Sequence, residues 1–288
     1  MILGVIFIFN LFKKKKKEKP AHFHNIYRQM NGLLNIVPGN AQDIGRREEQ
    51  QDSFLFSDME NPELVAKIGV LAVLADGMGG LKMGREASTL AVRTFLVEYS
   101  TKTPEETIPE ELKRSTLVAN GAVFDMATRS NLAWNTGTTL VAAVVDLDEL
   151  YWISVGDSHI YLFRDQTLTQ LNRDHNYSYQ LQTQVSQGIL TQEEADVHPE
   201  RNALTSFLGM DVLGEIDQNL QPINLKPGDR ILLCSDGLHG VLSPEEIIQA
   251  LGYPAQEAAE LLLTQTLSKS LRHQDNVTVA ILACEPSS

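Results

Sequence analysis

The stretch VLAVLADGMGG, residues 70–80, decides the fold of this 288-residue chain. Six consecutive apolar residues predict a buried strand, and Asp76 stands directly where that strand ends. Three of the four residues after Asp76 are glycines, which remove side chains where a backbone turns sharply or approaches a ligand. The carbonyl of Gly77 is then free to bind a metal ion. The stretch predicts a strand that delivers a carboxylate and an open backbone turn to one rim of a sheet.

Other apolar runs extend this strand into a layered domain. Short runs rich in β-branched residues, ending in Gly, Asp or Asn, predict more strands, and apolar residues three to four apart predict amphipathic helices. The strands between residues 138 and 164 follow one another through tight turns such as Asp146 to Asp148, which favours antiparallel pairing. The sequence therefore predicts an α+β domain with strands near 69–75, 138–145, 150–155, 159–164, 229–234 and 276–283, and helices near 83–99, 109–129 and 255–271.

The composition permits a sizeable core and restricts the partners. Hydrophobic residues make up 43% of the chain, which is ample for one large domain. The formal net charge is −13, yet residues 1–30 carry +6, so the rest of the chain carries −19. Such an acidic body repels the phosphate backbone of nucleic acid, and we expect no nucleic-acid partner. The two cysteines, Cys234 and Cys284, lie in no CxxC motif, which argues against disulfides and zinc and favours a reducing cytoplasm.

The N-terminal segment has an unusual composition. Residues 1–12 are apolar apart from Asn10 and are followed by five lysines. This run is too short to span a bilayer, which takes about 20 apolar residues, and it lacks the order of a signal peptide. Two interpretations of residues 1–19 remain. One is a peripheral anchor on anionic lipid at the inner face of the membrane. The other, which we favour, is a disordered tail or a misassigned start codon. We expect residues 1–33 to be this tail and residues 34–285 to be one cytoplasmic catalytic domain.

Four aspartates stand beside the ends of strand-like runs: Asp76, Asp157, Asp236 and Asp275. Strands can deliver carboxylates from distant parts of a sequence to one rim of a sheet. Carboxylate, carbonyl and water oxygens are the ligands that Mg²⁺ and Mn²⁺ prefer, and a two-metal site needs one carboxylate between both ions. A single aspartate at a strand end is more often ordinary turn chemistry. The set of four is what predicts a metal site.

The motifs around these aspartates resemble those of the metal-dependent protein phosphatase family, PPM or type 2C. The resemblance covers most of residues 40–284, and its motifs stand in the family's order. Each motif is weak alone, whereas the ordered set is specific. The motifs are Arg47-Glu48-Glu49-Gln50-Gln51-Asp52, Asp76-Gly77-Met78-Gly79-Gly80, Gly137-Thr138-Thr139, Gly156-Asp157-Ser158-His159, Ser235-Asp236-Gly237 and Asp275-Asn276.

The resemblance implies a central sandwich of two antiparallel β-sheets flanked by α-helices on both faces, with two Mn²⁺ or Mg²⁺ ions between the sheets. In that family the aspartate matching Asp76 bridges the two ions, and the carbonyl matching Gly77 binds the second. The aspartates matching Asp236 and Asp275 bind the first ion. Asp157 matches a residue that helps to hold a third, weaker ion in bacterial members.

Two further residues gain roles from the resemblance. Arg47 matches the arginine that grips the substrate phosphate, a task that suits a planar two-pronged cation, and we expect it to contact substrate only. Asp52 matches an acid that supports the attacking water. The expected reaction is hydrolysis of a phosphate ester by a metal-activated water. No CxxxxxR motif is present, which argues against a phosphocysteine route.

The sequence departs from the family pattern at three positions. Gln51 stands where many relatives carry an acidic residue for the second metal, although its amide oxygen is still a possible ligand. Met78 replaces a histidine proposed as general acid in animal members, which leaves protonation of the leaving group to water. His159 replaces the usual arginine after Gly156-Asp157-Ser158, and we interpret it as a hydrogen-bonded strand residue at the edge of the site.

Residues 174–209 resemble the mobile flap of bacterial members. The segment is polar, with five glutamines between Gln180 and Gln192. A surface excursion beside a cleft would select substrates and control access. Its histidines lack the spacing of a zinc site, and we assign them no metal.

These observations favour a bacterial-type serine/threonine protein phosphatase that acts as a monomer on phosphorylated proteins, the substrates of a cognate Ser/Thr kinase. An alternative is a catalytically weak regulatory or binding module of the same fold, which Gln51 and His159 make possible. Five retained motif residues argue for activity. Unpaired buried charges cost stability, so a chain that had lost catalysis would be expected to lose these residues as well. The same site would also serve a phosphatase for a regulator of a sigma-factor pathway, and the sequence does not separate that reading from the first.

Overall fold

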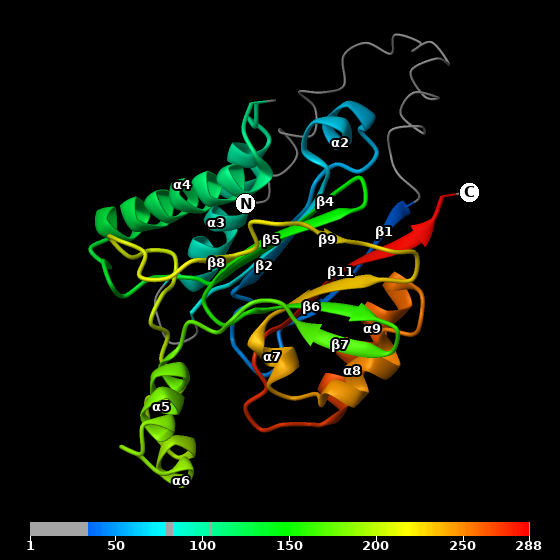
Figure 1. Cartoon of the computed structure of the whole chain (residues 1–288). Helices are drawn as coiled ribbons and strands as arrows, with labels where there is room; N and C mark the ends of the chain where they lie inside the picture. Colours follow the sequence, from blue (N-terminus) through cyan, green and yellow to red (C-terminus); the bar gives the residue numbers. More distant parts are fainter. Residues whose placement is uncertain (1–33, 79–82, 104, 288) are drawn as a thin grey trace.

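The computed structural model describes residues 34–78, 83–103 and 105–287, and it contains two packed β-sheets (Figure 1). The first sheet has five strands in the order β1-β11-β10-β6-β7, and the second follows the order β2-β3-β4-β5-β8, with β9 also pairing with β5. The first sheet contains β1 (Leu34–Asp43), β11 (Val277–Pro286), β10 (Arg230–Cys234), β6 (His159–Arg164) and β7 (Thr167–Gln170). The second contains β2 (Asp52–Phe56), β3 (Val70–Asp76), β4 (Leu140–Asp146), β5 (Glu149–Val155), β8 (Asp217–Gln218) and β9 (Ile223–Asn224).

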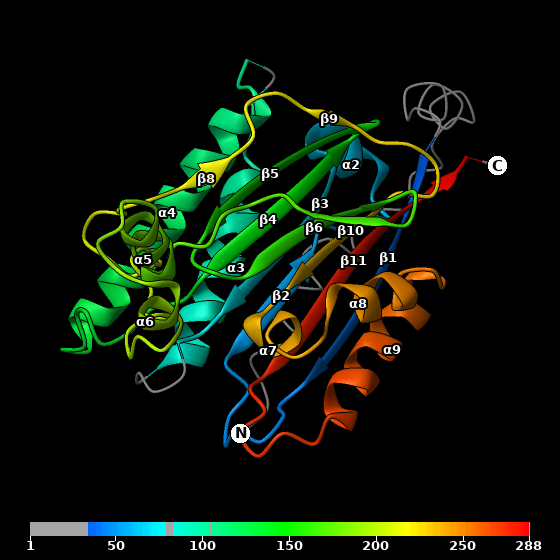
Figure 2. The same cartoon turned by 60° about the horizontal axis from the view of Figure 1, so that its bottom comes forward.

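Helices cover both outer faces of this sandwich. In Figure 1, α3 (Gly84–Tyr99) and α4 (Ile108–Arg129) lie above the sheets, and α8 (Pro244–Ala250) and α9 (Ala255–Ser268) lie below them. Two shorter helices, α5 (Tyr177–Ser186) and α6 (Gln192–Asp196), project away from the sandwich in Figure 1, and they lie at the front of the view in Figure 2. The remaining described helices are α2 (Pro62–Ile68) and α7 (Asp236–His239). All strand pairs are antiparallel, so the predicted fold class is confirmed.

The hydrophobic core forms three layers, as this architecture requires. One layer lies between the two sheets and includes Leu74, Ile160 and Ile231. A second packs α3 and α4 on the second sheet, and a third packs α8 and α9 on the first sheet. The strands β3, β4 and β10 are apolar on both faces because each lies between two of these layers. Their double burial explains why they stood out in the sequence.

The sequence predicted the central strands and the long helices but missed several elements. The predicted helix 109–129 is α4, which begins with a capping box between Thr107 and Glu110. Strand β1 was missed because it contains Pro38 and Gly39. Gly39 is needed there, since a Cβ atom at this position would lie 2.2 Å from the Ala255 carbonyl oxygen at the start of α9.

The predicted tail, residues 1–33, and its proposed membrane contact lie outside the described residues. None of the described helices is both long enough and apolar enough to cross a membrane. The boundaries of the predicted domain, 34–285, remain a prediction.

Arg114 on α4 links the two long helices, α3 and α4, through ion pairs. Its guanidinium bonds to Glu98 of α3 and to Glu111, whose side chain is fully buried, and it lies 3.4 Å from Glu106. Loss of Arg114 would leave Glu111 as a buried carboxylate without its cation.

We expect Arg114→Met to lower the free energy of unfolding by about 3 kcal/mol, because removal of one partner of a buried pair is strongly destabilising. The measurement is urea unfolding followed by circular dichroism. The matched control is Arg129→Met on the same helix, since Arg129 pairs with Asp125 on the surface and that pair contributes little. Equal unfolding midpoints for the two variants would contradict a structural role for the Arg114 cluster.

Candidate metal centre

The predicted carboxylates come from both sheets. Asp52 begins β2 and is paired in register with Asp76, which ends β3. Asp236 is the first residue of α7 and follows β10 after Ser235, and Asp275 lies two residues before β11. Asp157 follows β5 in a turn that leads to β6. The sandwich therefore brings five acidic residues from distant parts of the chain to one end of the sheets.

Asp52 is held by hydroxyl groups from the first sheet. Its Oδ2 atom accepts hydrogen bonds from Ser235 Oγ at 2.8 Å and from Thr278 Oγ1 at 2.7 Å. Its Oδ1 atom is buried and has no hydrogen-bond partner among the described residues. Burial raises the pKa of Asp52 to about 6, although these two hydroxyl groups oppose the shift. A nearby positive charge would stabilise the ionised form of such a buried carboxylate.

Asp76 and its neighbours repel one another. Burial, followed by the charges of Asp52 and Asp236, raises the pKa of Asp76 well above its usual value. Burial and then Asp236 raise the pKa of Asp157 to about 7. Burial and then Asp275 raise the pKa of Asp236, whose buried Oδ1 atom also has no partner in the described part of the chain. These mutual effects place the predicted ligands in one electrostatic cluster.

The donor set of this cluster fits hard divalent cations. All its ligand atoms are oxygens, as Mn²⁺ and Mg²⁺ prefer, and a cation would offset the repulsion and the two unpartnered oxygens. Within residues 34–78, 83–103 and 105–287, no three His, Cys, Asp or Glu side chains are already arranged to hold an ion. The fit therefore rests on charge and on unpartnered oxygens. Asp76, Gly77, Asp236 and Asp275 would hold two ions, and Asp157 a third.

The turn after Asp76 requires glycine. The Gly77 N–H donates to the Gln51 carbonyl at 3.1 Å, which ties the turn to the start of β2. A Cβ atom at Gly77 would lie 2.4 Å from the Gly84 carbonyl oxygen, so a larger residue would force α3 away. The role of Gly77 as a carbonyl ligand stays a prediction.

Gln51 is a junction of backbone contacts. Its N–H donates to Asn276 Oδ1 at 2.8 Å, while its carbonyl accepts from Gly77 and from the Ser88 hydroxyl. Its side-chain amide lies 3.4 Å from Glu49 Oε2. These hydrogen bonds fix the position of the Gln51 main chain. The role of the Gln51 side chain as a metal ligand stays a prediction.

We expect Gln51→Glu to lower the Mn²⁺ concentration for half-maximal activity by about threefold to tenfold, because one partly screened charge is added at the second ion. Metal titrations of initial rate measure this shift. Gln50→Glu is the matched control, since it adds the same charge one residue away, where the Gln50 side chain contacts backbone atoms of Asp43 and Asp52. If the titrations of Gln51→Glu and wild type overlay, the Gln51 side chain is not a ligand.

Arg47 contacts a predicted metal ligand. Its Nη2 atom donates to Asp275 Oδ2 at 2.6 Å, and the Arg47 side chain is 45% exposed. The hydrogen bond to Asp275 raises the pKa of Arg47. The expectation that Arg47 contacts substrate only is therefore wrong for this structure. Its exposure leaves it accessible to a phosphate, and its role in binding substrate stays a prediction.

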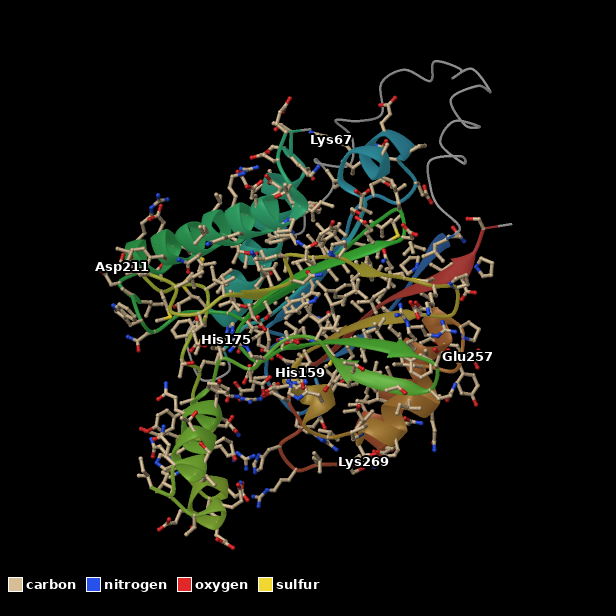
Figure 3. All side chains as sticks on the ribbon, viewed as in Figure 1. Lys67, His159, His175, Asp211, Glu257 and Lys269 are labelled. Atoms are coloured by element: carbon tan, nitrogen blue, oxygen red, sulfur yellow. The ribbon has the colours of Figure 1, made fainter. Side chains whose placement is uncertain are left out.

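The predicted flap, residues 174–209, contains α5 and α6 and is fixed at both ends beside the candidate ligands. At its start, His175 exchanges backbone and side-chain hydrogen bonds with Gly156, next to Asp157. At its end, Leu208 forms an antiparallel bridge with Thr138, which also bridges Gly77. His159 and His175 lie on the side of the sandwich that faces α5 (Figure 3). The mobility of the flap and its role in substrate selection stay predictions.

Sequence reasoning missed the residues that support the ligands. Ser235 and Thr278 hold Asp52, and His239 contacts the Asp157 carbonyl oxygen. His159 was not missed: the sequence predicted a hydrogen-bonded strand residue, and His159 lies on β6 with hydrogen bonds to Asp174 and Tyr161. Ser235 lies inside a quoted motif, but Asp52 is 183 residues away, and no local pattern relates the two.

Acidic residues with unpartnered oxygens beside an arginine favour chemistry on a phosphate ester. The fold and the site have the features of the metal-dependent phosphatase class. The chain belongs to the protein phosphatase 2C family, which matches residues 42–274. The resemblance and fold predicted from the ordered motifs are confirmed.

Named relatives and solved structures agree with this family. The chain is 34% identical over 212 residues to the serine/threonine protein phosphatase PstP of Mycobacterium tuberculosis, covering 73% of this chain but 40% of that protein's length. It is 30% identical over 242 residues to the serine/threonine phosphatase stp of Listeria welshimeri, covering 82% of this chain and 90% of that one. A solved structure of the PstP catalytic domain with two manganese ions has a TM-score of 0.68 and 29% identity, covering 88% of this chain and 99% of that one.

Proposed function

We propose that this chain is a Mn²⁺- or Mg²⁺-dependent protein phosphatase that hydrolyses phosphoserine and phosphothreonine in proteins. The observation that carries the proposal is the cluster of Asp52, Asp76, Asp157 and Asp236 at the end of the sandwich, where burial first and nearby carboxylates second raise the pKa of each residue. The manganese-bearing relative and the names of the phosphatases above support the same activity.

The residues of the site divide into three tasks. Asp76, Asp236 and Asp275 would hold the ions with the Gly77 carbonyl, and Asp157 would hold a further, weaker one. Bound Mn²⁺ or Mg²⁺ supplies charge neutralisation at the phosphoryl oxygens and lowers the pKa of water. Arg47 binds and orients the phosphate. The unpartnered Oδ1 atom of Asp52 accepts a hydrogen bond from the attacking water, while Ser235 and Thr278 fix the carboxylate.

The test is release of phosphate from a phosphothreonine peptide, a phosphoserine peptide and p-nitrophenyl phosphate. Each is measured with Mn²⁺, with Mg²⁺ and with EDTA, and a phosphotyrosine peptide serves as control. We expect turnover of the first three substrates that depends on metal, and little turnover of phosphotyrosine. No metal-dependent release above background would favour the alternative, a catalytically weak regulatory module of the same fold.

The proposal extends to the partners and location of the chain. Its substrates are phosphoproteins made by a cognate Ser/Thr kinase, and it acts as a monomer. A cytoplasmic location is supported by the two buried, unpaired cysteines. Contact with the inner face of the membrane through residues 1–19 is part of the proposal, supported by their sequence alone.

A further inference from the structure

Two histidines from different elements stack beside the candidate metal centre. The rings of His159 on β6 and His239 on α7 lie 3.5 Å apart between centroids, with 12° between their planes. The His159 ring also meets the Tyr161 ring edge-on at 5.3 Å. His159 is 7% exposed. None of these side chains has a part in the proposed reaction, so the close stack needs another explanation.

The hydrogen bonds of the pair fix which ring atoms carry protons. His239 Nε2 lies 3.1 Å from the Asp157 carbonyl oxygen, and because a carbonyl accepts only, Nε2 must donate. His159 Nε2 lies 2.8 Å from Asp174 Oδ1, where it donates to the carboxylate, and its Nδ1 atom lies 2.7 Å from the Tyr161 hydroxyl. Burial and then the charge of His159 lower the pKa of His239 to about 3. Independently of this shift, the contact with a carbonyl oxygen shows that His239 donates through Nε2.

These contacts join three acidic segments of the site. Helix α7 begins with Asp236, a candidate ligand of the first ion, and ends with His239. His239 holds the main chain of Asp157, and the stacked His159 holds Asp174 at the start of the flap. After burial and Asp236, the charge of Asp174 also contributes to the raised pKa of Asp157. The two rings connect α7, the turn after β5 and the start of the flap.

We propose that His239 and His159 form a positioning pair that holds the Asp157 main chain, so that the Asp157 carboxylate is oriented for the weaker cation. The pair acts through Asp157 and is not itself a metal ligand. A residue that orients a ligand in this way commonly changes metal affinity by about 10- to 100-fold when it is replaced. The inference rests on the proposed role of Asp157 as a metal ligand.

Two substitutions separate the hydrogen bond from the stack. His239→Phe keeps a stacking ring but has no donor, and His239→Gln keeps an N–H donor at a similar distance without the ring. His198→Phe is the matched control, because His198 lies on the flap and contacts Tyr177 and Glu200. Asp157→Asn removes the candidate ligand itself. Thermal unfolding in EDTA checks that each variant is folded.

The measurement is Mn²⁺ binding to each full-length variant, by electron paramagnetic resonance of free Mn²⁺ and by isothermal titration calorimetry. We expect His239→Phe to weaken the weaker class of Mn²⁺ sites about 10-fold, with the tighter class unchanged. We expect His239→Gln and His198→Phe to bind as wild type does.

The outcomes distinguish the possible failures. If Asp157→Asn leaves Mn²⁺ binding unchanged, both the assignment of Asp157 and the positioning pair are wrong. If Asp157→Asn removes the weaker class while His239→Phe retains it, only the positioning pair is wrong. If His239→Gln loses the weaker class as His239→Phe does, the donated hydrogen bond is insufficient and the proposal in this form is overturned. None of these results depends on phosphatase activity, so an inactive enzyme would contradict the proposed function alone.

Discussion

Asp76→Asn is expected to lower kcat on the order of a thousandfold while the domain stays folded. Asp76 is the candidate bridge between two ions, and the bound ions contribute several kcal/mol of stabilisation to the transition state. The hydrophobic layers do not depend on this carboxylate. The measurement is initial rate with saturating Mn²⁺ and a phosphothreonine peptide. Activity close to that of wild type would contradict the assigned site.

Asp146→Asn is the matched control for this prediction. Asp146 ends β4 as Asp76 ends β3, and because the two strands are antiparallel, the two aspartates lie at opposite ends of the sheet. The same chemical change at Asp146 should leave kcat within about twofold of wild type, since surface substitutions away from a site have small effects.

The metal-free stability of Asp76→Asn provides a second readout. The pKa of Asp52 is raised to about 6 and that of Asp157 to about 7, so the folded state binds protons more tightly than the unfolded one. Without metal, the contribution of these two carboxylates to stability is therefore largest below about pH 4 and declines as pH rises through about 7. Removal of one repelling charge should make this decline smaller. We expect the Tm of Asp76→Asn in EDTA at pH 8 to equal or exceed that of wild type.

Arg47→Ala is expected to raise KM for a phosphopeptide by about 10- to 100-fold, as the loss of a charge-assisted hydrogen bond to phosphate implies. The ion pair with Asp275 adds a second expectation. Arg47 competes with a cation for this carboxylate, so its removal should lower the Mn²⁺ concentration for half-maximal activity or leave it unchanged. Steady-state rates over a grid of substrate and Mn²⁺ concentrations measure both quantities.

Two further variants show whether a change in KM is specific to the guanidinium of Arg47. Arg47→Lys keeps the charge but lacks the two-pronged geometry, and we expect an intermediate KM. Arg46→Ala is the matched control, because the Arg46 side chain is exposed and its N–H bonds to the Gln274 carbonyl. An unchanged KM in Arg47→Ala together with weaker Mn²⁺ binding would mean that Arg47 serves to position Asp275 and does not bind substrate.

The sequence predicted the fold through its most buried strands. β3, β4 and β10 are apolar on both faces, so each appears as a continuous apolar run with a polar residue at its end. β2 was not recognised because it has only 5 residues and is partly exposed, so its apolar run Phe54-Leu55-Phe56 is short. The helices α5 and α6 were also missed, since their polar, glutamine-rich sequence resembles a surface loop.

The sequence also indicated the acidic ligands but not what holds them. Asp76, Asp157, Asp236 and Asp275 were found because strand ends are visible in a sequence. The ion pair between Arg47 and Asp275 joins residues 228 apart, and its existence follows only from the pairing of strands. The stacking of His159 on His239 likewise depends on how β6 and α7 are placed by the pairing of distant strands. Contacts that depend on the register of distant strands have no local signal.

The position of β11 has a consequence for the order in which the enzyme is made. β11 lies between β1 and β10 in the first sheet, although it is the last strand in the chain. While a ribosome is still synthesising residues 277–286, β1 and β10 have no partner between them, and Thr278 cannot yet hold Asp52. Domains generally fold as units during synthesis. A chain that stops before β11 would therefore fold incompletely, because it lacks both the strand that joins β1 to β10 and the Thr278 hydroxyl that holds Asp52.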